Sequence, residues 1–191
     1  MTWAPNYATV AELRDYLRIG DNADNGFLAV WVATVSRNVD DHCGRQFGKA
    51  DTPVTRYYTP RYDRHEGAWF ADIDDLQDTT GLAFTAEDGS TVTGYTLLPR
   101  NAAADGKPYE QVKLTAATGE LAGLAPWGWN TPPAAVRTGL FLQGARLAAR
   151  RDSPFGIAGS PSEGSEIRLL AQLDPDFKTS LKPYVRKWWA A

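Results

Sequence analysis

The sequence predicts an α+β fold, in which a small α-helical bundle carries an antiparallel β-rich insertion between its second and third main helices. Apolar residues recur at helical spacing up to about residue 43 and again from residue 131. Short runs rich in β-branched and aromatic residues fill the region between, enough for four to six strands. Because these strands do not alternate with helices, we expect them to pair antiparallel. We assign residues 1–51 and 122–191 to a helical core with a C-terminal docking arm, and residues 52–121 to the β insertion.

The composition is that of an ordinary globular protein. Of the 191 residues, 43% are hydrophobic and 23% are charged. The single cysteine excludes an internal disulfide bond. The longest apolar run, Phe27 to Val35, is too short to cross a bilayer. We expect no membrane association, and no secretory signal, since no basic-then-apolar stretch opens the sequence.

Charge is distributed unevenly, although the net charge is only −3. Residues 1–130 carry 11 basic and 18 acidic side chains, whereas residues 131–191 carry 9 basic and 5 acidic ones. Such polarity is typical of a subunit whose two ends meet different partners, although solvated faces produce similar splits.

Two helices are expected before the insertion. Thr9 and Glu12 have the spacing of a capping box at the start of the first, and Gly20 is expected to end it. The second should begin at Asp24 or Asn25 and stop at Gly44, which can take the left-handed conformation. Its apolar side is expected to consist of Phe27, Leu28, Trp31, Val32, Val35 and Val39.

Two more helices are expected after the insertion, whose own turns are marked by Asp88-Gly89 and Asp105-Gly106. Thr131 should cap the third helix, with Pro132 and Pro133 in its first turn. A loop over residues 153–166, a strand over 167–173 and a short helix opened by Asp174 and Pro175 should follow. The apolar face of the third helix is expected to consist of Val136, Leu140, Phe141, Leu147 and Ala148.

Two glycines stand inside the third helix. Gly139 and Gly144 each cost about 1 kcal/mol relative to alanine in a helix interior. We therefore expect that they allow close packing against another backbone.

The stretch Val39–Phe47, "VDDHCGRQF", combines the only cysteine with one of two histidines. A thiol nucleophile needs a base that presents its ring to the sulfur, but adjacent residues at a helix end point about 100° apart. One cysteine and two histidines also fall short of a zinc ligand set. We interpret His42 and Cys43 as the last turn of a helix, and we expect no catalytic residue, cofactor or metal site there.

An acidic run, Asp72, Asp74, Asp75 and Asp78, leaves a second interpretation open. Alternation along a strand would place Asp72 and Asp74 on one face, where a cation could bridge them. A solvated strand edge that discourages mispairing is the more common role of such a run.

Tryptophan is abundant, with seven residues. Trp69, Trp127 and Trp129 could form a platform for stacking sugars, although aromatic residues more often fill cores or interfaces. Near the C-terminus an indole pair lies among basic residues, which is typical of an interface. The predicted partner-binding residues are Lys182, Pro183, Tyr184, Arg186, Lys187, Trp188 and Trp189.

The order of these predicted helices, strands and motifs resembles that of the head–tail connector (adaptor or head-completion) proteins of tailed bacteriophages. The similarity covers residues 5–60 and 130–187, with "CGRQF" at Cys43–Phe47 and "ARRDSPFGIAG" at Ala149–Gly159 as the most telling motifs. The β insertion is not covered and is longer than in compact members.

This resemblance implies a structural virion protein and not an enzyme. Members assemble as a ring, typically of twelve copies, beneath the portal protein in the neck of the virion, after synthesis in the bacterial cytoplasm. A tail-side completion or terminator protein binds the other side, and genome DNA passes through the channel without sequence-specific binding. The C-terminal arm commonly docks on the portal.

Two other functions remain open at this point. A small carbohydrate- or cell-wall-binding module would use Trp69, Trp127 and Trp129 as surface residues. An enzyme would use His42 and Cys43.

Overall fold

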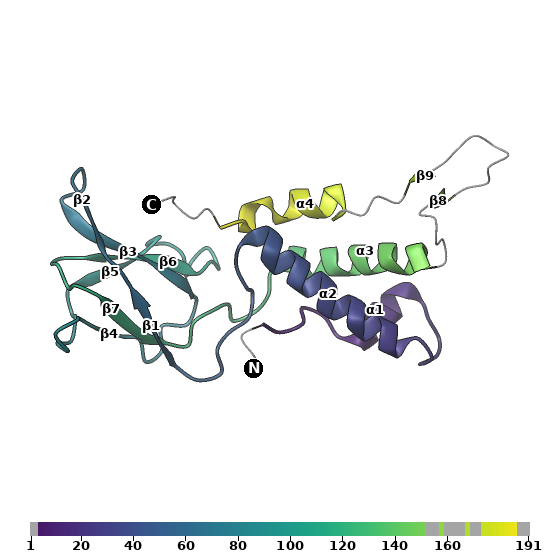
Figure 1. Cartoon of the computed structure of the whole chain (residues 1–191), viewed down its shortest axis with the longest axis horizontal. Coiled ribbons are helices and arrows are strands. Elements are labelled where there is room, and N and C mark those ends of the chain that lie inside the picture. The colour runs from purple at the N-terminus through teal and green to yellow at the C-terminus, as the bar shows by residue number, and fades with distance from the viewer. Residues whose placement is uncertain (1–3, 152–156, 159–166, 169–172, 187–191) are drawn as a thin grey trace. The chain divides into compact units, whose positions relative to one another are not determined.

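The computed structural model of the chain describes residues 4–151, 157–158, 167–168 and 173–186. Among these residues it contains four α-helices and antiparallel sheets, so the fold class is α+β, as predicted (Figure 1). The chain forms two compact units. Gln46–Thr131 makes up most of the first, which we call the β unit, and Pro5–Arg45 with the chain from Pro132 makes up the second, which we call the helical unit.

The helical unit begins with α1, Val10–Leu17. The predicted capping box is confirmed: the Thr9 hydroxyl accepts from the Glu12 amide at 3.2 Å, and the Glu12 carboxylate accepts from the Thr9 amide at 2.7 Å. The prediction that Gly20 ends the helix is wrong. Arg18 takes the left-handed conformation (φ 58°), and its amide already donates to carbonyls of the last turn. The chain has therefore turned away before it reaches the glycine.

Helix α2 spans Asn25–Cys43 and ends, as predicted, at Gly44 with φ 61°. Its core side consists of Leu28, Val32, Val35 and Val39, all buried. Phe27 was predicted on this side but is 57% exposed. Successive residues of a helix point about 100° apart, so Phe27 faces away from the side that Leu28 buries.

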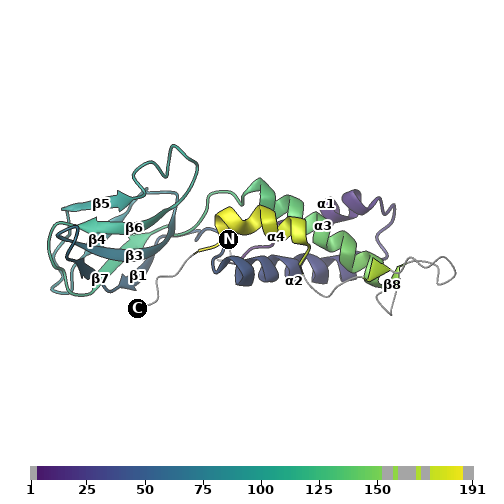
Figure 2. The same ribbon diagram turned by 90° about the horizontal axis from the view of Figure 1, so that it is seen from above.

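Helix α3 spans Ala134–Arg151 and runs beside α2 (Figure 2). It begins after both prolines, so the prediction that Pro132 and Pro133 lie inside its first turn is wrong. The Pro133 carbonyl accepts the first helical bond, from the Val136 amide at 2.9 Å. Val136 and Leu140 are buried as predicted, whereas Phe141, Leu147 and Ala148 are only half-buried.

The two glycines of α3 do mark close packing, but against side chains and not against another backbone. A Cβ on Gly139 would overlap the ring of Phe177 in α4, and one on Gly144 would lie 2.7 Å from Cδ1 of Leu13 in α1. The glycines thus allow both neighbouring helices to reach α3.

Helix α4 spans Pro175–Leu181, with Asp174 as its cap and proline at its first position, as predicted. A 3₁₀ turn, Lys182–Tyr184, follows and contains Pro183. Between α3 and α4 the structure shows two short paired strands, β8 (Ile157–Ala158) and β9 (Ile167–Arg168). The rest of the predicted loop and of the strand predicted over 167–173 lies mostly outside the described residues.

The β unit contains seven strands in two antiparallel sheets, one more strand than the upper limit of the prediction. The additional strand is β7, which starts at residue 121, where the insertion was predicted to end, and pairs with β1. One sheet has the order β1-β7-β4 and the other β2-β3-β6-β5. The strands are β1 Val54–Tyr58, β2 Arg61–Asp63, β3 Ala68–Leu76, β4 Ala83–Thr85, β5 Tyr95–Leu98, β6 Tyr109–Leu114 and β7 Leu121–Ala125.

The core of the β unit surrounds the indole of Trp127, which is fully buried. Its Nε1–H donates to the Val54 carbonyl oxygen at 2.7 Å, which fixes the start of edge strand β1. The two ends of the unit are also joined, since the Ala50 amide donates to the Trp127 carbonyl and the Trp129 amide donates to the Gly48 carbonyl, both at 2.9 Å. Apolar side chains from both sheets complete the core: Ala71, Ile73, Leu76, Phe84, Val112, Leu114, Leu121 and Ala125.

Candidate functional site

The predicted docking segment directly follows α4 and belongs to the helical unit. The Asp174 carboxylate accepts from the amides of Asp176 at 2.9 Å and Phe177 at 3.2 Å, so the first turn is fixed. The same carboxylate pairs with the Arg146 guanidinium of α3. Phe177 and Leu181, four residues apart on one side of α4, are buried. The helix therefore anchors the segment that follows it.

The end of this segment is hydrogen-bonded to the end of α2. The Arg186 amide donates to the Cys43 carbonyl oxygen at 2.8 Å. That carbonyl belongs to the last turn of α2, where carbonyl groups lack helical partners. The "CGRQF" helix end and the basic C-terminal segment, which are far apart in the sequence, are thus neighbours.

The predicted docking residues differ in exposure. Lys182 and Pro183 are exposed, whereas Tyr184 and Arg186 are half-buried. Lys187, Trp188 and Trp189 lie outside the described residues. The described part of the segment is therefore partly packed on the helical unit and partly open to a partner.

Cys43 lies inside the helical unit and is completely buried. Burial raises the pKa of its thiol to about 11. His42, its neighbour, is half-buried. At neutral pH the thiol is protonated, which is the unreactive form.

The carboxylates of the acidic strand β3 have hydrogen-bond or ion-pair partners within the β unit. Asp74 pairs with the Arg56 guanidinium at 2.7 Å and accepts from the Tyr58 hydroxyl at 3.0 Å. Asp72 accepts from the Gln111 side-chain amide at 2.9 Å. Among the described residues, no three His, Cys, Asp or Glu side chains are grouped so as to hold a metal ion.

Asp78 and Asp75 also have partners within the β unit. Asp78 pairs with the Lys49 ammonium group at 2.5 Å, and this hydrogen bond holds the pKa of the carboxyl well below its usual range. Asp75 is buried and accepts from Nε1–H of Trp129 at 2.6 Å. These carboxylates act as structural partners of side chains from other strands and loops.

Two of the three tryptophans considered as a sugar platform are not at the surface. Trp127 is 0% and Trp129 is 4% exposed, so neither can stack on a ligand. Trp69 is half-buried and lies 5.4 Å from the ring of Tyr62, centroid to centroid. The interpretation of these residues as surface tryptophans is therefore wrong for Trp127 and Trp129, because a small β unit needs its largest side chains for its core.

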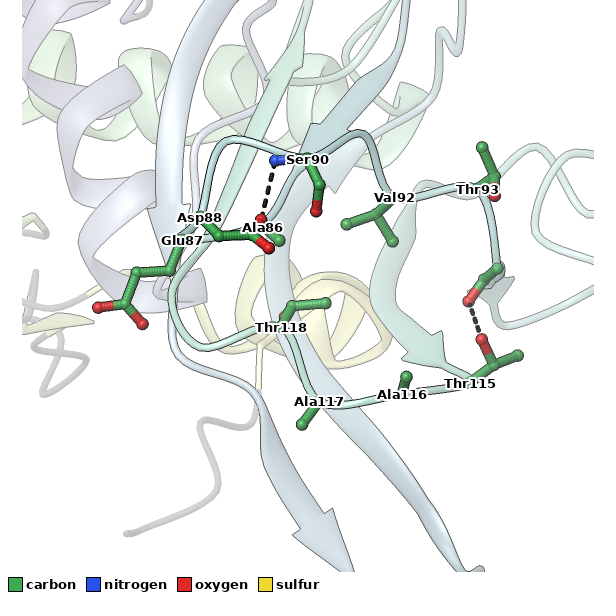
Figure 3. A pocket seen from close by; sticks show the side chains of 11 residues that line it. Ala86, Glu87, Asp88, Ser90, Val92, Thr93, Thr115, Ala116, Ala117 and Thr118 are labelled. Atoms are coloured by element: carbon green, nitrogen blue, oxygen red, sulfur yellow. Dashed lines mark hydrogen bonds between the residues drawn. The ribbon is translucent and has the colours of Figure 1, made fainter.

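One pocket of the β unit, about 510 Å³ in volume, lies between the chain segments 86–94 and 115–118 (Figure 3). Its shape depends on loop hydrogen bonds: the Ser90 amide donates to the Asp88 carboxylate at 2.8 Å, and the Thr115 hydroxyl donates to the Gly94 carbonyl at 3.1 Å. The Glu87 side chain points away from Thr93 and Thr115 (Figure 3). The lining supplies hydroxyl and backbone groups and the carboxylates of Glu87 and Asp88, and it contains no histidine, cysteine or lysine.

The chain matches no protein-family model and shows no significant similarity to a curated protein. In the described part of the chain, no helix has the length and apolar character needed to cross a membrane.

Proposed function

We propose that this protein is a structural virion component, a ring-forming head–tail connector subunit of a tailed bacteriophage, and not an enzyme. In this proposal the subunit docks under the portal protein, contributes to the DNA channel and meets a tail-side completion protein on its other side. Its architecture is a helical bundle interrupted by a β-rich insertion. The subunit acts in the neck of the virion after synthesis in the host cytoplasm.

The observation that carries the proposal is the hydrogen bond between the Arg186 amide and the Cys43 carbonyl. It joins the two parts of the chain, residues 5–60 and 130–187, that the resemblance to connector proteins covers. The segment beyond Arg186 continues into Lys187, Trp188 and Trp189, and large aromatic and basic side chains of this kind are the usual anchors of protein interfaces. An acidic surface on the portal would attract them, and salt would weaken the attraction.

A carbohydrate-binding module is less well supported, because Trp127 and Trp129 are buried. An enzyme that uses Cys43 is also less well supported, since its thiol is enclosed and its pKa is raised. The chemistry of the described residues thus favours contacts with other macromolecules.

The proposal is tested by binding to purified portal rings. We compare the full chain with a chain lacking residues 187–191 and with the double variant Trp188→Ala/Trp189→Ala. Both changes leave the Arg186 contact in place, so the helical unit should stay folded by circular dichroism. We expect each to weaken portal binding at least about tenfold, the range for loss of one strong anchor.

The matched control is Trp69→Ala, which removes an indole from the β unit and should leave portal binding unchanged. Full affinity of the truncated chain would place docking elsewhere. A full chain that does not bind portal rings at any salt concentration would contradict the proposed function itself.

A further inference from the structure

An irregular segment of the helical unit, residues 5–8, precedes α1 and contacts α2. It contains neither helix nor strand. Two of its residues are nevertheless buried, Tyr7 with 3% and Ala8 with 7% of the surface exposed. Side chains of α2 supply hydrogen bonds that hold this segment in place. We call residues 5–8 the strap.

Three hydrogen bonds connect the strap to α2. The Tyr7 amide donates to Oγ of Ser36 at 3.1 Å, and the Tyr7 hydroxyl donates to the Asp40 carboxylate. The Arg37 guanidinium donates to the Pro5 carbonyl at 2.7 Å and lies 5.8 Å from the centroid of the Tyr7 ring. All three contacts fall between Ser36 and Asp40, little more than one turn of the helix. We therefore expect them to form and break together.

Asp40 is a buried carboxyl group with few partners that compensate its charge. Only 8% of the residue is exposed. One carboxylate oxygen accepts from Tyr7, whereas the other makes no hydrogen bond in the described part of the chain and faces the Arg37 guanidinium at 3.2 Å. Loss of hydration makes the ionised form of such a group costly. This cost depends on the strap, because the Tyr7 side chain ends on the carboxylate.

The groups around Asp40 oppose this cost only in part. Titratable side chains that interact with Asp40, directly or through Cys43, are Tyr7 of the strap, Arg37, Asp41 and Cys43 of α2, and Arg45 after its end. The Tyr7 hydrogen bond and the Arg37 charge favour the ionised carboxylate, whereas Asp41 disfavours it. Burial is the largest effect and raises the pKa of the Asp40 carboxyl to about 6.

The sign of the pH dependence follows from what the strap does to hydration. When the strap is open, water reaches the carboxylate and its pKa returns toward about 4. Between about pH 4 and pH 6 the closed form therefore holds a proton that the open form has lost. Closure is most favourable below this window, weakens as the pH rises through it and stays at the weaker level above it.

We infer that the strap is a pH-dependent element that closes on α2 more tightly in acid than at neutral pH, with the Asp40 carboxyl as the titrating group. Opening is local, since it breaks contacts of residues 5–8 and leaves the backbone hydrogen bonds of α2 in place. It uncovers the polar side chains of Ser36 and Asp40. The inference is independent of the proposed function.

The test is hydrogen exchange of the Tyr7 amide in the full chain, measured by NMR, because this amide is bonded to Ser36 only when the strap is closed. We expect its protection, corrected for the intrinsic pH dependence of exchange, to fall about tenfold between pH 4.5 and pH 7.5. The amide of Val35, inside α2, reports opening of the helix. Protection of Tyr7 should lie well below that of Val35 at every pH.

Two variants of α2 identify the titrating group. Asp40→Asn keeps an acceptor for the Tyr7 hydroxyl without a charge, so protection of the Tyr7 amide should change by less than about twofold over the same pH range. Asp41→Asn, at an exposed neighbour, is the matched control and should retain the tenfold fall.

Tyr7→Phe covers the case in which Asp40→Asn does not fold. It removes a hydrogen bond that favours the ionised carboxylate, so the midpoint of the Asp40 titration, followed by the carboxyl ¹³C shift, should move to higher pH. A midpoint that stays in place or falls would overturn the inference.

Three exchange results would also overturn it. Protection of Tyr7 that does not change with pH would show that closure is not linked to a proton. An undiminished fall in Asp40→Asn would assign the proton to another group. Equal protection of Tyr7 and Val35 would show that the strap opens only when the helical unit unfolds.

Discussion

Gly139 of α3 lies directly under the ring of Phe177 of α4, so any side-chain atom at position 139 would overlap the ring. Phe177 is buried and cannot swing into solvent without exposing its apolar surface. This contact joins a helix that follows the β unit to the helix that anchors the predicted docking segment.

We predict that Gly139→Ala lowers the free energy of unfolding by about 1–3 kcal/mol, the range for overpacking, although alanine favours the helix by about 1 kcal/mol. Urea denaturation followed by circular dichroism measures the change. The control is Gly26→Ala in α2, where an added Cβ meets nothing within 4 Å and stability should stay equal or rise. Equal stability of the two variants would show that α4 moves away from α3 without cost.

Asp40 should make the free energy of unfolding of the helical unit depend on pH. Burial raises the pKa of its carboxyl to about 6, and the hydrogen bond from Tyr7 and the charge of Arg37 offset only part of this effect. Between about pH 4 and pH 6 the folded chain therefore binds more protons at this site than the unfolded chain. The contribution of Asp40 to the free energy of unfolding falls as the pH rises through this window.

We predict that Asp40→Asn gains stability relative to the natural chain as the pH rises from 4 to 7, by about 1–3 kcal/mol. Urea denaturation at several pH values measures the difference, and the carboxyl ¹³C shift of Asp40 reports its titration directly. Asp41→Asn, at an exposed neighbour, controls for the loss of one negative charge. A carboxyl titration midpoint below pH 4 would contradict the prediction.

Cys43 should react only slowly with thiol reagents in the folded chain. Its thiol is enclosed and its pKa is raised by burial to about 11. We predict that a thiol reagent labels it at pH 8 at least about 100-fold more slowly than in urea, because thiolate and access are both lacking. A cysteine introduced at exposed position 30 is the control and should react rapidly in the folded chain.

Cys43→Ser should retain the fold and lose no more than about 1–2 kcal/mol of stability. Rapid labelling of the native thiol, or loss of an activity in a folded Cys43→Ser variant, would refute the structural role that we assign to this residue.

The stability of the β unit should depend strongly on Trp127. We predict that Trp127→Phe costs about 2–4 kcal/mol, because it removes buried volume and leaves the Val54 carbonyl without its indole partner. Unfolding monitored by tryptophan fluorescence measures the loss. Trp69→Phe, at a half-buried position, is the control and should cost less. A larger cost at Trp69 would place the centre of the β core elsewhere.

Local features of this chain could be predicted from its sequence, and contacts between distant segments could not. The Thr9–Glu12 capping box, the left-handed Gly44 and the Asp174 cap each depend on residues within four positions, and all three are present. The helical period placed the buried side of α2 correctly at Leu28 and its repeats. The predicted apolar side also included Phe27, although it lies about 100° from Leu28 around the helix and is 57% exposed.

The candidate site was predicted only in part. Composition indicated Lys182–Trp189 as a binding segment, but nothing in the sequence signals that the Arg186 amide reaches the Cys43 carbonyl, since backbone groups are the same in every residue. For the tryptophans, the sequence suggested exposure where the structure shows burial. Trp127 and Trp129 flank a glycine in what reads as a loop, and their burial follows from strand pairing that brings residues 48–50 beside them.

Hydrogen bonds between residues 48–50 and 127–129 hold the two ends of the β unit side by side. A segment with adjacent ends can be exchanged as a cassette, because the chain that receives it needs to close only a short gap, at small entropic cost. We therefore expect genes for related proteins to differ by replacement of this whole segment while the flanking helices stay the same. Recombination at the positions that encode Gln46 and Thr131 would exchange the β unit and leave the sequence of the flanking helices unchanged.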